Sequence, residues 1–535
     1  MKKIKILDCT LRDGGYINNW KFGKKTIRAI IDKLDESKVD IIECGFLTEN
    51  VNNEEYSLFS SPEEVEWVSK GKTHNSMIVA MIAIGEKEIH PDKLPECNGK
   101  SITGIRLTFH NHEIDKAINW ARIIKDKGYK IFMQPVGTIS YTDLELLQLV
   151  ERMNELTPYA FYIVDTLGSM TKNELLHFFY NIDANLNSNI RIGFHAHNNL
   201  QLAFSNAQEL SRVQTQREVI LDASIYGMGR AAGNLPTELI TQYINKNIET
   251  RYDVMTILDI YDEYISLIRK EYEWGYNVPY HIAASHKCHP NYASYLMNKQ
   301  TLTMKDIEKI ILSIPKERGV LFDKKLIEEL YLQYQNRSID DHKAILDIKK
   351  MVQNRNILIL APGKSLKSQF KKIQDYVKQE DPFVIAVNFV DQKFGLNACF
   401  VSNHKRIEHI KEELKYENDI VLIVTSNIEL EREYNYICVD YFSYINQDEL
   451  VFDNVGLMLL RVLEKCGIKS VVLAGFDGFK SRYDENYYND ELNLRIEENE
   501  LNEKQTRIKK QLQEMQKVMK LQYLTNSVYE EGGNV

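Results

Sequence analysis

The chain has few cysteines, and it lacks the paired spacings that would give them structural roles. Seven cysteines occur among 535 residues, an odd number, and no two form a Cys-x-x-Cys pair. This pattern argues against a disulfide framework and against a structural zinc site. Cys9 and Cys44 fall in predicted strands, where we expect them to pack in the core.

Long apolar runs and basic blocks are missing as well. No run approaches the roughly eighteen apolar residues of a transmembrane helix, and the first residues show no signal-peptide pattern. We therefore expect a cytoplasmic protein without a membrane span. The net charge of -9 and the pI near 5.9, with no basic stretch interleaved with aromatics, give nucleic-acid binding little support. Small-molecule chemistry is favoured instead.

What the chain does contain is 44% hydrophobic residues, enough for more than one packed core. From residue 3 to about 246, short apolar runs alternate with amphipathic segments. Strands are predicted to begin near Ile4, Asp40, Met77, Gly104, Lys130, Ala160, Ile190 and Val219. Eight strand–helix units over this length predict a TIM (β/α)8 barrel, which we assign to residues 1–250.

The remaining sequence divides into two further segments. Residues 251–350 are helical in pattern and predict an extension that covers one end of the barrel. Residues 351–535 predict a second, Rossmann-like α/β domain, with strands at 357–361, 383–387, 420–425 and 470–474. From Leu492 onward, apolar residues at heptad spacing predict a long amphipathic helix that packs on its own domain or pairs between subunits.

Two motifs at the ends of predicted barrel strands carry the candidate chemistry. Residues 7–15 read Leu-Asp-Cys-Thr-Leu-Arg-Asp-Gly-Gly, and residues 193–199 read Gly-Phe-His-Ala-His-Asn-Asn. Alternate residues of a strand face the same way, so His195 and His197 can point at one ion, with Asp13 as an oxygen ligand. Such a set leaves positions open on a divalent cation that binds substrate. The alternative is a buried pair of histidines satisfied by neighbours, with a surface Arg-Asp pair.

Other polar residues fall within or directly after the predicted barrel strands. They are Arg12, Glu43, Arg106, Gln134, Asp165 and Thr166, followed by the Gly-rich turn at residues 227–234. A TIM barrel keeps its active site at the C-terminal ends of its strands. So many polar groups at one face are hard to explain as core packing.

The barrel segment resembles the metal-dependent family that includes hydroxymethylglutaryl-CoA lyase, 2-isopropylmalate synthase and the 4-hydroxy-2-oxoacid aldolases. The resemblance rests on residues 10–14, Glu43, residues 165–168, residues 195–197 and the turn at 227–234. It implies that a carbon–carbon bond beside a carbonyl is made or broken through an enolate of pyruvate or of an acyl thioester. The implied cofactor is a divalent metal, Mn²⁺ or Mg²⁺, with Zn²⁺ and Co²⁺ as alternatives.

The same resemblance implies the metal ligands. Asp13, His195 and His197 match the ligands of the family. Asn234 lies where the family often has a metal-proximal asparagine. The alternative for Asn234 is a turn residue that tolerates unusual backbone angles.

Four further residues are expected around the reacting carbonyl, and Arg12, Glu43 and Thr166 are implied by family matches. Arg12 matches the enolate-stabilising arginine, and Glu43 matches the carboxylate that orients it. We expect Arg106 and Thr166 to bind substrate. Thr166 could equally cap the next helix.

Two tyrosines bear on the catalytic base. Tyr292 resembles a tyrosine of the aldolases' helical domain that reaches back towards the substrate, which favours an aldolase over a thioester condensation. The aldolases carry a catalytic histidine shortly after the Arg-Asp-Gly motif, where this chain has Tyr16. Candidate bases are therefore Tyr16, Tyr292, His286, His289 or a water on the metal, and a phenol with a pKa of about 10 would need nearby cations. The alternative for Tyr16 is a packing aromatic at the barrel mouth.

The second domain resembles the bacterial sialyltransferase family and related domains of surface-polysaccharide loci. The matching segments are residues 359–367, 387–389 and 473–478. A Gly-containing turn at a helix N-terminus exposes N–H groups, a natural phosphate site. The turn is not a Walker motif, and the loop after residue 477 lacks the histidine expected as a transferase base. The expected nucleotide-binding residues are Gly363, Ser365, Asn388 and Asp477.

Together these patterns predict a metal-dependent aldolase or lyase that acts on a 2-oxoacid and an aldehyde. Its second domain is expected to handle a nucleotide sugar, so that the protein supplies a building block for a surface glycan. One alternative is a Claisen-type acyltransferase that uses an acyl-CoA, which the Gly-rich turn favours. Another is a barrel without catalysis that acts as a scaffold or sensor, which Tyr16 motivates. We expect a homo-oligomer with contacts in the helical extension.

Overall fold

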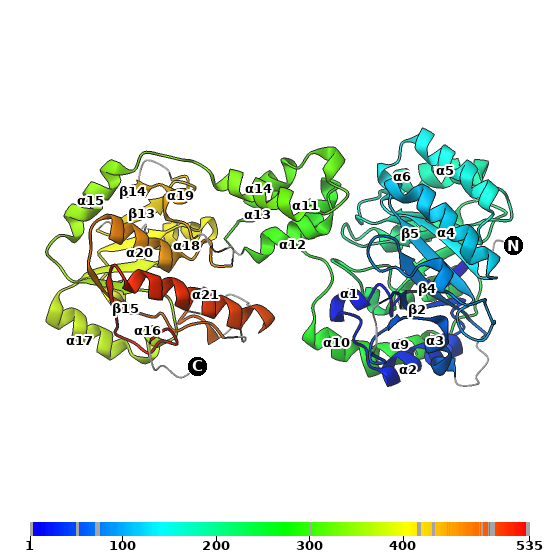
Figure 1. Cartoon of the computed structure of the whole chain (residues 1–535), viewed down its shortest axis with the longest axis horizontal. Helices are drawn as coiled ribbons and strands as arrows, with labels where there is room; N and C mark the ends of the chain where they lie inside the picture. Colours follow the sequence, from blue (N-terminus) through cyan, green and yellow to red (C-terminus); the bar gives the residue numbers. More distant parts are fainter. Residues whose placement is uncertain are drawn as a thin grey trace. The chain divides into compact units, whose positions relative to one another are not determined.

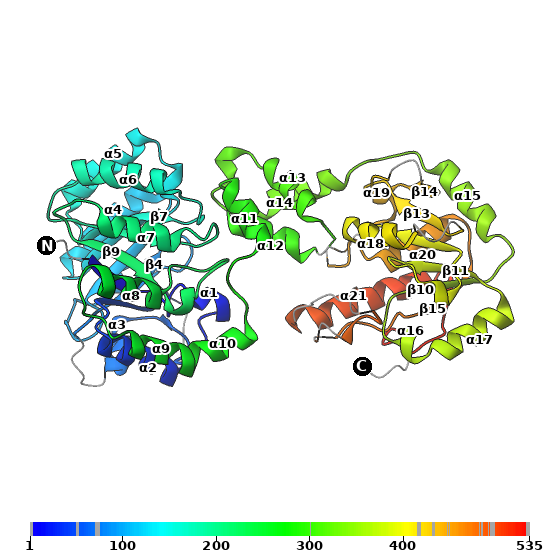
Figure 2. The same ribbon diagram turned by 180° about the vertical axis from the view of Figure 1, so that it is seen from behind.

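The fold is taken from a computed structural model of the chain (Figures 1 and 2). It describes residues 4–49, 53–69, 75–299, 301–414, 419–430, 434–446, 448, 450–480, 482, 485–489, 492 and 498–530. The chain forms two compact units. The first contains residues 1–294 and 311–324, and the second contains residues 295–310 and 325–535.

The first unit is built on a closed parallel barrel. Its strands are β1 (Ile4–Asp8), β2 (Ile41–Leu47), β4 (Met77–Ala83), β5 (Gly104–Phe109), β6 (Lys130–Pro135), β7 (Ala160–Asp165), β8 (Arg191–Ala196) and β9 (Val219–Ala223). Each strand pairs in parallel with its neighbours, and the β1–β2 pairing closes the ring. A two-residue strand, β3 (Leu58–Phe59), is added beside β2. The predicted TIM barrel and its eight strands are confirmed.

Helices cover the outside of the barrel (Figure 1). They are α2 (Lys24–Glu36), α3 (Pro62–Ser69), α4 (Ile114–Asp126), α5 (Asp143–Leu156), α6 (Lys172–Asn185), α7 (Ala203–Arg212), α8 (Thr237–Asn247) and α9 (Val254–Ile260). Capping boxes start α5 and α6, where Thr142 and Thr171 accept the N–H groups of glutamates three residues on. The buried face of α5 repeats at helical spacing, as in Leu146, Leu149 and Met153. Cys9 and Cys44 are fully buried, as expected.

The segment after the barrel is helical, as its pattern predicts. It contains α10 (Ser266–Glu271), α11 (Val278–Ser285), α12 (Pro290–Asn298), α13 (Met304–Leu312), α14 (Lys324–Gln335) and α15 (His342–Val352). The loop between α13 and α14 belongs to the barrel unit. None of the helices in the described ranges has the length and apolar character needed to cross a membrane.

The second unit is a parallel sheet in the order β14-β13-β12-β11-β10-β15-β16. Its strands are β10 (Ile357–Leu360), β11 (Phe383–Val387), β12 (Ala398–Val401), β13 (Val421–Thr425), β14 (Tyr436–Val439), β15 (Ser470–Ala474) and β16 (Lys520–Tyr523). Four strands lie where the sequence predicts them, whereas β12, β14 and β16 are additional. The sheet is parallel throughout, which confirms a second α/β domain.

Helices pack on both faces of this sheet. They are α16 (Ser365–Ser368), α17 (Phe370–Glu380), α18 (His404–Leu414), α19 (Tyr441–Tyr444), α20 (Val455–Lys465) and α21 (Glu498–Gln516). The predicted long helix corresponds to α21, and residues 493–497 before it lie outside the described residues. Ile508, Leu512 and Met515 of α21 are buried in the core of their own unit.

Candidate metal centre and active site

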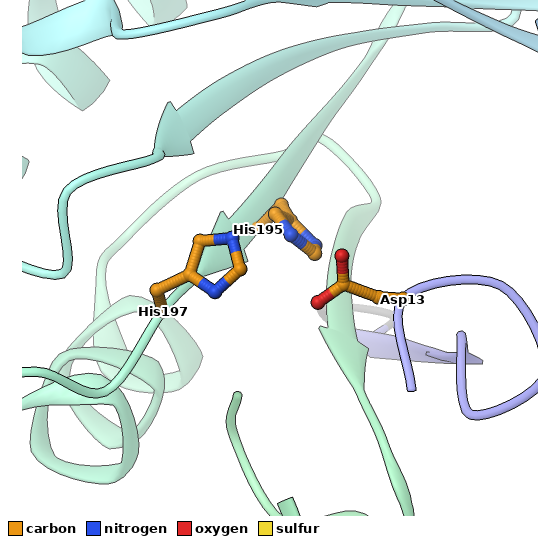
Figure 3. A group of neighbouring side chains, drawn as sticks. All are labelled: Asp13, His195 and His197. Atoms are coloured by element: carbon orange, nitrogen blue, oxygen red, sulfur yellow. The ribbon is translucent and has the colours of Figure 1, made fainter. Parts of the chain in front are cut away.

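Three side chains converge at the C-terminal end of the barrel (Figure 3). Asp13 follows β1, His195 lies in β8, and His197 comes just after β8. One ligand atom from each lies within 4.8 Å of the others, and all three residues are buried. Figure 3 shows the two imidazoles and the carboxylate turned towards one shared space. This arrangement is the one that alternating strand positions predict.

The charge state of this group suits a divalent cation. Burial lowers the pKa of His197 to about 3, so its imidazole is neutral near pH 7. Burial alone would raise the pKa of Asp13, but Arg12, His197 and His195 hold it well below its usual range. A neutral imidazole and an ionised carboxylate are the forms that coordinate metals.

Asn234 joins the cluster from the Gly-rich turn. Its Nδ2 donates to Asp13 and to the carbonyl of Met228, while its Oδ1 is buried with no partner among the described residues. The left-handed backbone angles of the turn fall on Gly227 (φ 60°), Ala231 (φ 59°) and Gly233 (φ 81°), and Asn234 is not among them. The unpaired amide oxygen therefore fits a fourth ligand position better than the role of a strained turn residue.

Arg12 is held rigidly beside Asp13. Its Nε donates to Glu43 at 2.8 Å and its Nη1 to Asp13 at 2.6 Å. Burial alone would lower its pKa, but Glu43 and Asp13 raise that pKa well above the usual value. The third nitrogen, Nη2, is buried and has no partner in the described part of the chain. Arg12 thus offers a fixed, charged N–H donor to a substrate oxygen.

A cavity of about 370 Å³ opens on this cluster. Its lining includes Arg12, Asp13, Tyr16, Glu86, His110, Gln134, Thr166, His195, His197, Arg230, His289 and residues 320–322. A substrate that entered the cavity would touch both the metal ligands and Arg12. Thr166 lines it too, and its hydroxyl accepts the N–H of Gly137 at 2.9 Å. Because the cap of α6 is Thr171, Thr166 does not cap that helix.

Arg106 and Tyr292 do not line this cavity, which corrects the expectation that they touch substrate. Arg106 is fully buried between Glu43 and Asp222, with its Nη1 2.6 Å from Glu43. The hydroxyl of Tyr292 lies 2.7 Å from the carbonyl oxygen of Leu321 and accepts the N–H of Asp323. Tyr292 therefore holds the loop that lines the cavity, instead of reaching the substrate itself.

Tyr16 lines the cavity, but its acidity does not suit a base. Its hydroxyl donates to Glu86 at 2.9 Å. Burial raises the pKa of Tyr16 well above its ordinary value, and Glu86 raises it further. The phenol therefore stays protonated near neutral pH and acts as a donor.

His289 also lines the cavity, whereas His286 does not. Burial lowers the pKa of His289 well below its ordinary value. The Nδ1 of this neutral ring accepts the N–H of Asn291, so the proton lies on Nε2. His289 is in this form a donor, not a base.

Three functional candidates were missed from the sequence. Asp222 in β9 lies 3.0 Å from Nδ1 of His195, although it occurs inside an apolar run. Glu86 follows β4 and accepts the Tyr16 hydroxyl. His110 follows β5, and its Nδ1 lies 3.0 Å from Glu113. A polar residue directly after a predicted strand is the signal that could have found His110.

The predicted nucleotide residues lie at one edge of the second sheet. Gly363, Asn388 and Asp477 line a cavity of about 140 Å³ at the C-terminal ends of β10, β11 and β15. Ser365 does not line it. Its N–H donates to Asp477 at 2.6 Å and its hydroxyl also contacts Asp477, so a carboxylate already occupies the expected phosphate position. This corrects the expectation for Ser365.

The barrel segment matches known proteins. The HMGL-like family model matches residues 3–263. A 4-hydroxy-2-oxovalerate aldolase of Geobacillus genomosp. 3 is 30% identical over 265 residues, 48% of this chain and 75% of that protein. One of the same name from Thermomicrobium roseum is 27% identical over 264 residues, 48% of this chain and 70% of that protein.

A crystal structure of an N-terminal domain from Bacteroides vulgatus is 27% identical, with a TM-score of 0.49, over 57% of this chain and 99% of that one. The extent of the match to the Geobacillus relative and the residues gathered at the barrel end lead to one conclusion. The chain belongs to the HMGL-like family and is an enzyme of the carbon–carbon lyase class.

Proposed function

We propose that the barrel makes or breaks a carbon–carbon bond beside the carbonyl of a pyruvate-like 2-oxoacid, with an aldehyde as the second reactant. The observation that carries the proposal is the unpaired Nη2 of Arg12, which belongs to the same cavity as Asp13, His195 and His197. The relatives named 4-hydroxy-2-oxovalerate aldolase support this chemistry.

The metal would be held by Asp13, His195 and His197, with the amide oxygen of Asn234 as a fourth donor. When bound, a divalent ion would draw electrons from the carbonyl of the 2-oxoacid. The two oxygen donors favour Mn²⁺ or Mg²⁺, and the two imidazoles keep Zn²⁺ and Co²⁺ as alternatives.

Arg12 would stabilise the negative charge that develops on the substrate oxygen. Its guanidinium is pinned by Glu43, which in turn accepts from Arg106 at 2.6 Å. These contacts hold the Arg12 guanidinium in place before negative charge has developed on the substrate oxygen. A preorganised donor of this kind stabilises the enolate more than the starting ketone.

We propose that His110 is the general base that removes the substrate proton when the enolate forms. Its Nδ1 faces the Glu113 carboxylate at 3.0 Å, which fixes the ring proton on Nδ1 and leaves Nε2 as the acceptor. His110 lines the cavity, and the two other candidates there, Tyr16 and His289, carry protons in their resting forms. Glu113 acts through His110 as a positioning residue.

The test is exchange of the pyruvate methyl protons with deuterium, followed by NMR. The 535-residue chain is incubated with pyruvate and Mg²⁺ in D2O. A second incubation uses Mn²⁺, which is chelated before the spectra are taken. We expect exchange that requires metal and is lost in Asp13→Ala. Asp143→Ala is the control, because that exposed carboxylate pairs with His177 outside the cavity.

Two results would overturn the proposal. Exchange of acetyl-CoA protons but not of pyruvate protons would indicate the Claisen-type acyltransferase. Metal binding without exchange of either substrate would indicate a scaffold or sensor barrel. The role in surface-glycan metabolism, the nucleotide sugar and the homo-oligomer stay sequence-based predictions.

A further inference from the structure

The second unit has a crevice where the strand order of its sheet reverses. From β10 the chain proceeds to β11 on one side, and β15 returns on the other side of β10. The loops after β10, β11 and β15 line the cavity of about 140 Å³ described above. In parallel sheets, ligands bind in the crevice at such a reversal.

Arg406 of α18 places a buried positive charge in this cavity. It is only 8% exposed and lines the cavity. Among the described residues its guanidinium has one recorded hydrogen bond, to the carbonyl of Leu492, and no carboxylate lies within ion-pair distance. Its guanidinium carbon lies 5.8 Å from the centre of the Tyr487 ring. Within the described part of the chain Arg406 is thus a buried cation without a counter-charge, which is costly, and a bound anion would lower that cost.

The N-terminus of α20 faces the same cavity. Asn454 caps the helix by accepting the N–H of Leu457 at 3.1 Å, and Val455 and Gly456 of the first turn line the cavity. The free N–H groups of a first helical turn attract anions. This feature is independent of Arg406, because it arises from the backbone of a different helix.

Asn388 supplies a third polar group. Its backbone adopts a left-handed conformation (φ 62°), and its Oδ1 is buried without a partner among the described residues. The carboxylate in the described lining is that of Asp477, both of whose oxygens contact Ser365. The crevice therefore offers an anion a guanidinium, helix N–H groups and the Asn388 amide.

We propose that this crevice binds a small phosphate ester, with its phosphate between Arg406 and the N-terminus of α20. The aromatic side chains of Phe476, Tyr487 and Tyr529 also line the cavity and would contact a flat ring on the ligand. This site differs from the Ser365 turn, which Asp477 closes. It does not depend on the activity proposed for the barrel.

The test is calorimetric titration of the EDTA-treated 535-residue chain with inorganic phosphate, pyrophosphate and the four ribonucleoside 5′-monophosphates. All proteins carry Asp13→Ala, so that the barrel site does not contribute metal-dependent phosphate binding. We expect one saturable site. Arg406→Gln should weaken binding about tenfold or more, because a charge-assisted contact to phosphate is lost.

Two further variants make the result decisive. Asn388→Asp keeps size and backbone preference and adds a negative charge, so it should also weaken binding. Arg355→Gln is the control. Arg355 lies just before β10, at the end of the strand opposite the crevice, and pairs with Asp381. Circular dichroism checks the fold, and if Arg406→Gln does not fold, Asn388→Asp decides.

Absence of binding at millimolar concentrations of all these probes would overturn the proposal. Binding that neither Arg406→Gln nor Asn388→Asp weakens would also overturn it. Tighter binding of a mononucleotide than of inorganic phosphate would identify a ring-bearing ester as the ligand. Equal binding would identify the phosphate group alone as what the crevice recognises.

Discussion

The Nδ1 atom of His195 lies 3.0 Å from Oδ2 of Asp222, and the same carboxylate oxygen contacts Arg106. Both Asp222 and Arg106 have fully buried side chains. A carboxylate in this position keeps the ring proton on Nδ1, so that Nε2 is the atom left to coordinate a metal. Asp222 would therefore orient a candidate metal ligand without itself coordinating the ion.

Replacing Asp222 with asparagine should weaken divalent metal binding. The amide keeps the size of the side chain but loses the charge that fixes the His195 ring. Loss of such an orienting carboxylate typically costs about 10-fold to 100-fold in metal affinity. The measurement is calorimetric titration of the metal-stripped protein with Mn²⁺. Asp143→Asn, which alters an exposed aspartate–histidine pair, should keep full affinity. Unchanged affinity in Asp222→Asn would remove this residue from the metal site.

Arg12→Ala should slow pyruvate proton exchange about a hundredfold or more while the metal stays bound. The unpaired Nη2 of Arg12 is the donor that the enolate oxygen would lose, and loss of one preorganised donor costs about this much. Exchange rates and metal content are measured on the same samples. Arg12→Lys keeps the positive charge near Glu43 but lacks Nη2, so it should also be slow. A normal rate in either variant would exclude Arg12 from the reaction.

His110→Gln should lower the exchange rate about a hundredfold or more, as the loss of a general base does. Metal affinity should stay unchanged, because His110 is outside the ligand group. The matched control is His112→Gln, whose ring stacks 5.7 Å from that of His110 but does not line the cavity. Equal rates in the two variants would show that another group moves the proton.

The barrel could be predicted because apolar residues make up half or more of each of its strands, as expected for strands buried on both faces. β12, β14 and β16 were not predicted because they are short, although β12 is apolar and buried throughout. Each has four residues, and β14 and β16 carry exposed side chains that dilute the apolar signal. Whether a short segment forms a strand depends on its pairing with neighbouring strands of the sheet, and the local sequence does not encode that pairing.

Residues of the site could be predicted only where both a residue and the residue it contacts belong to recognisable sequence motifs. Asp13, His195 and His197 meet because the barrel brings the ends of β1 and β8 to one face. The Tyr16–Glu86 contact joins residues 70 positions apart, and only closure of the barrel reveals it. Arg106 also follows from closure, because β5 places it opposite Glu43 and Asp222, below the cavity. A polar residue in a barrel strand can therefore contact other buried charged side chains, as Arg106 does, as readily as it contacts the substrate.

Asp8, in β1, should make the stability of the barrel depend on pH. Burial raises the pKa of Asp8 to about 6 from 3.8, although Thr237 and Thr10 donate to its carboxylate. Between these two values the folded state holds a proton that the unfolded state has lost. Stability should therefore be highest below pH 4 with respect to this group, and it should fall as the pH rises towards 6.

Asp8→Asn removes this titration, so its stability relative to the wild type should improve by about 2 kcal/mol between pH 4 and pH 7. The asparagine oxygen can accept only one of the two hydrogen bonds. This loss lowers the stability of Asp8→Asn equally at pH 4 and at pH 7, so it does not alter the expected change in the stability difference. Urea unfolding is followed by the fluorescence of the four tryptophans, all between residues 20 and 274 and therefore reporters of the barrel. Asp115→Asn, at a highly exposed carboxylate, should track the wild type. A difference between Asp8→Asn and the wild type that stays constant with pH would mean that Asp8 is ionised in the folded barrel throughout this range.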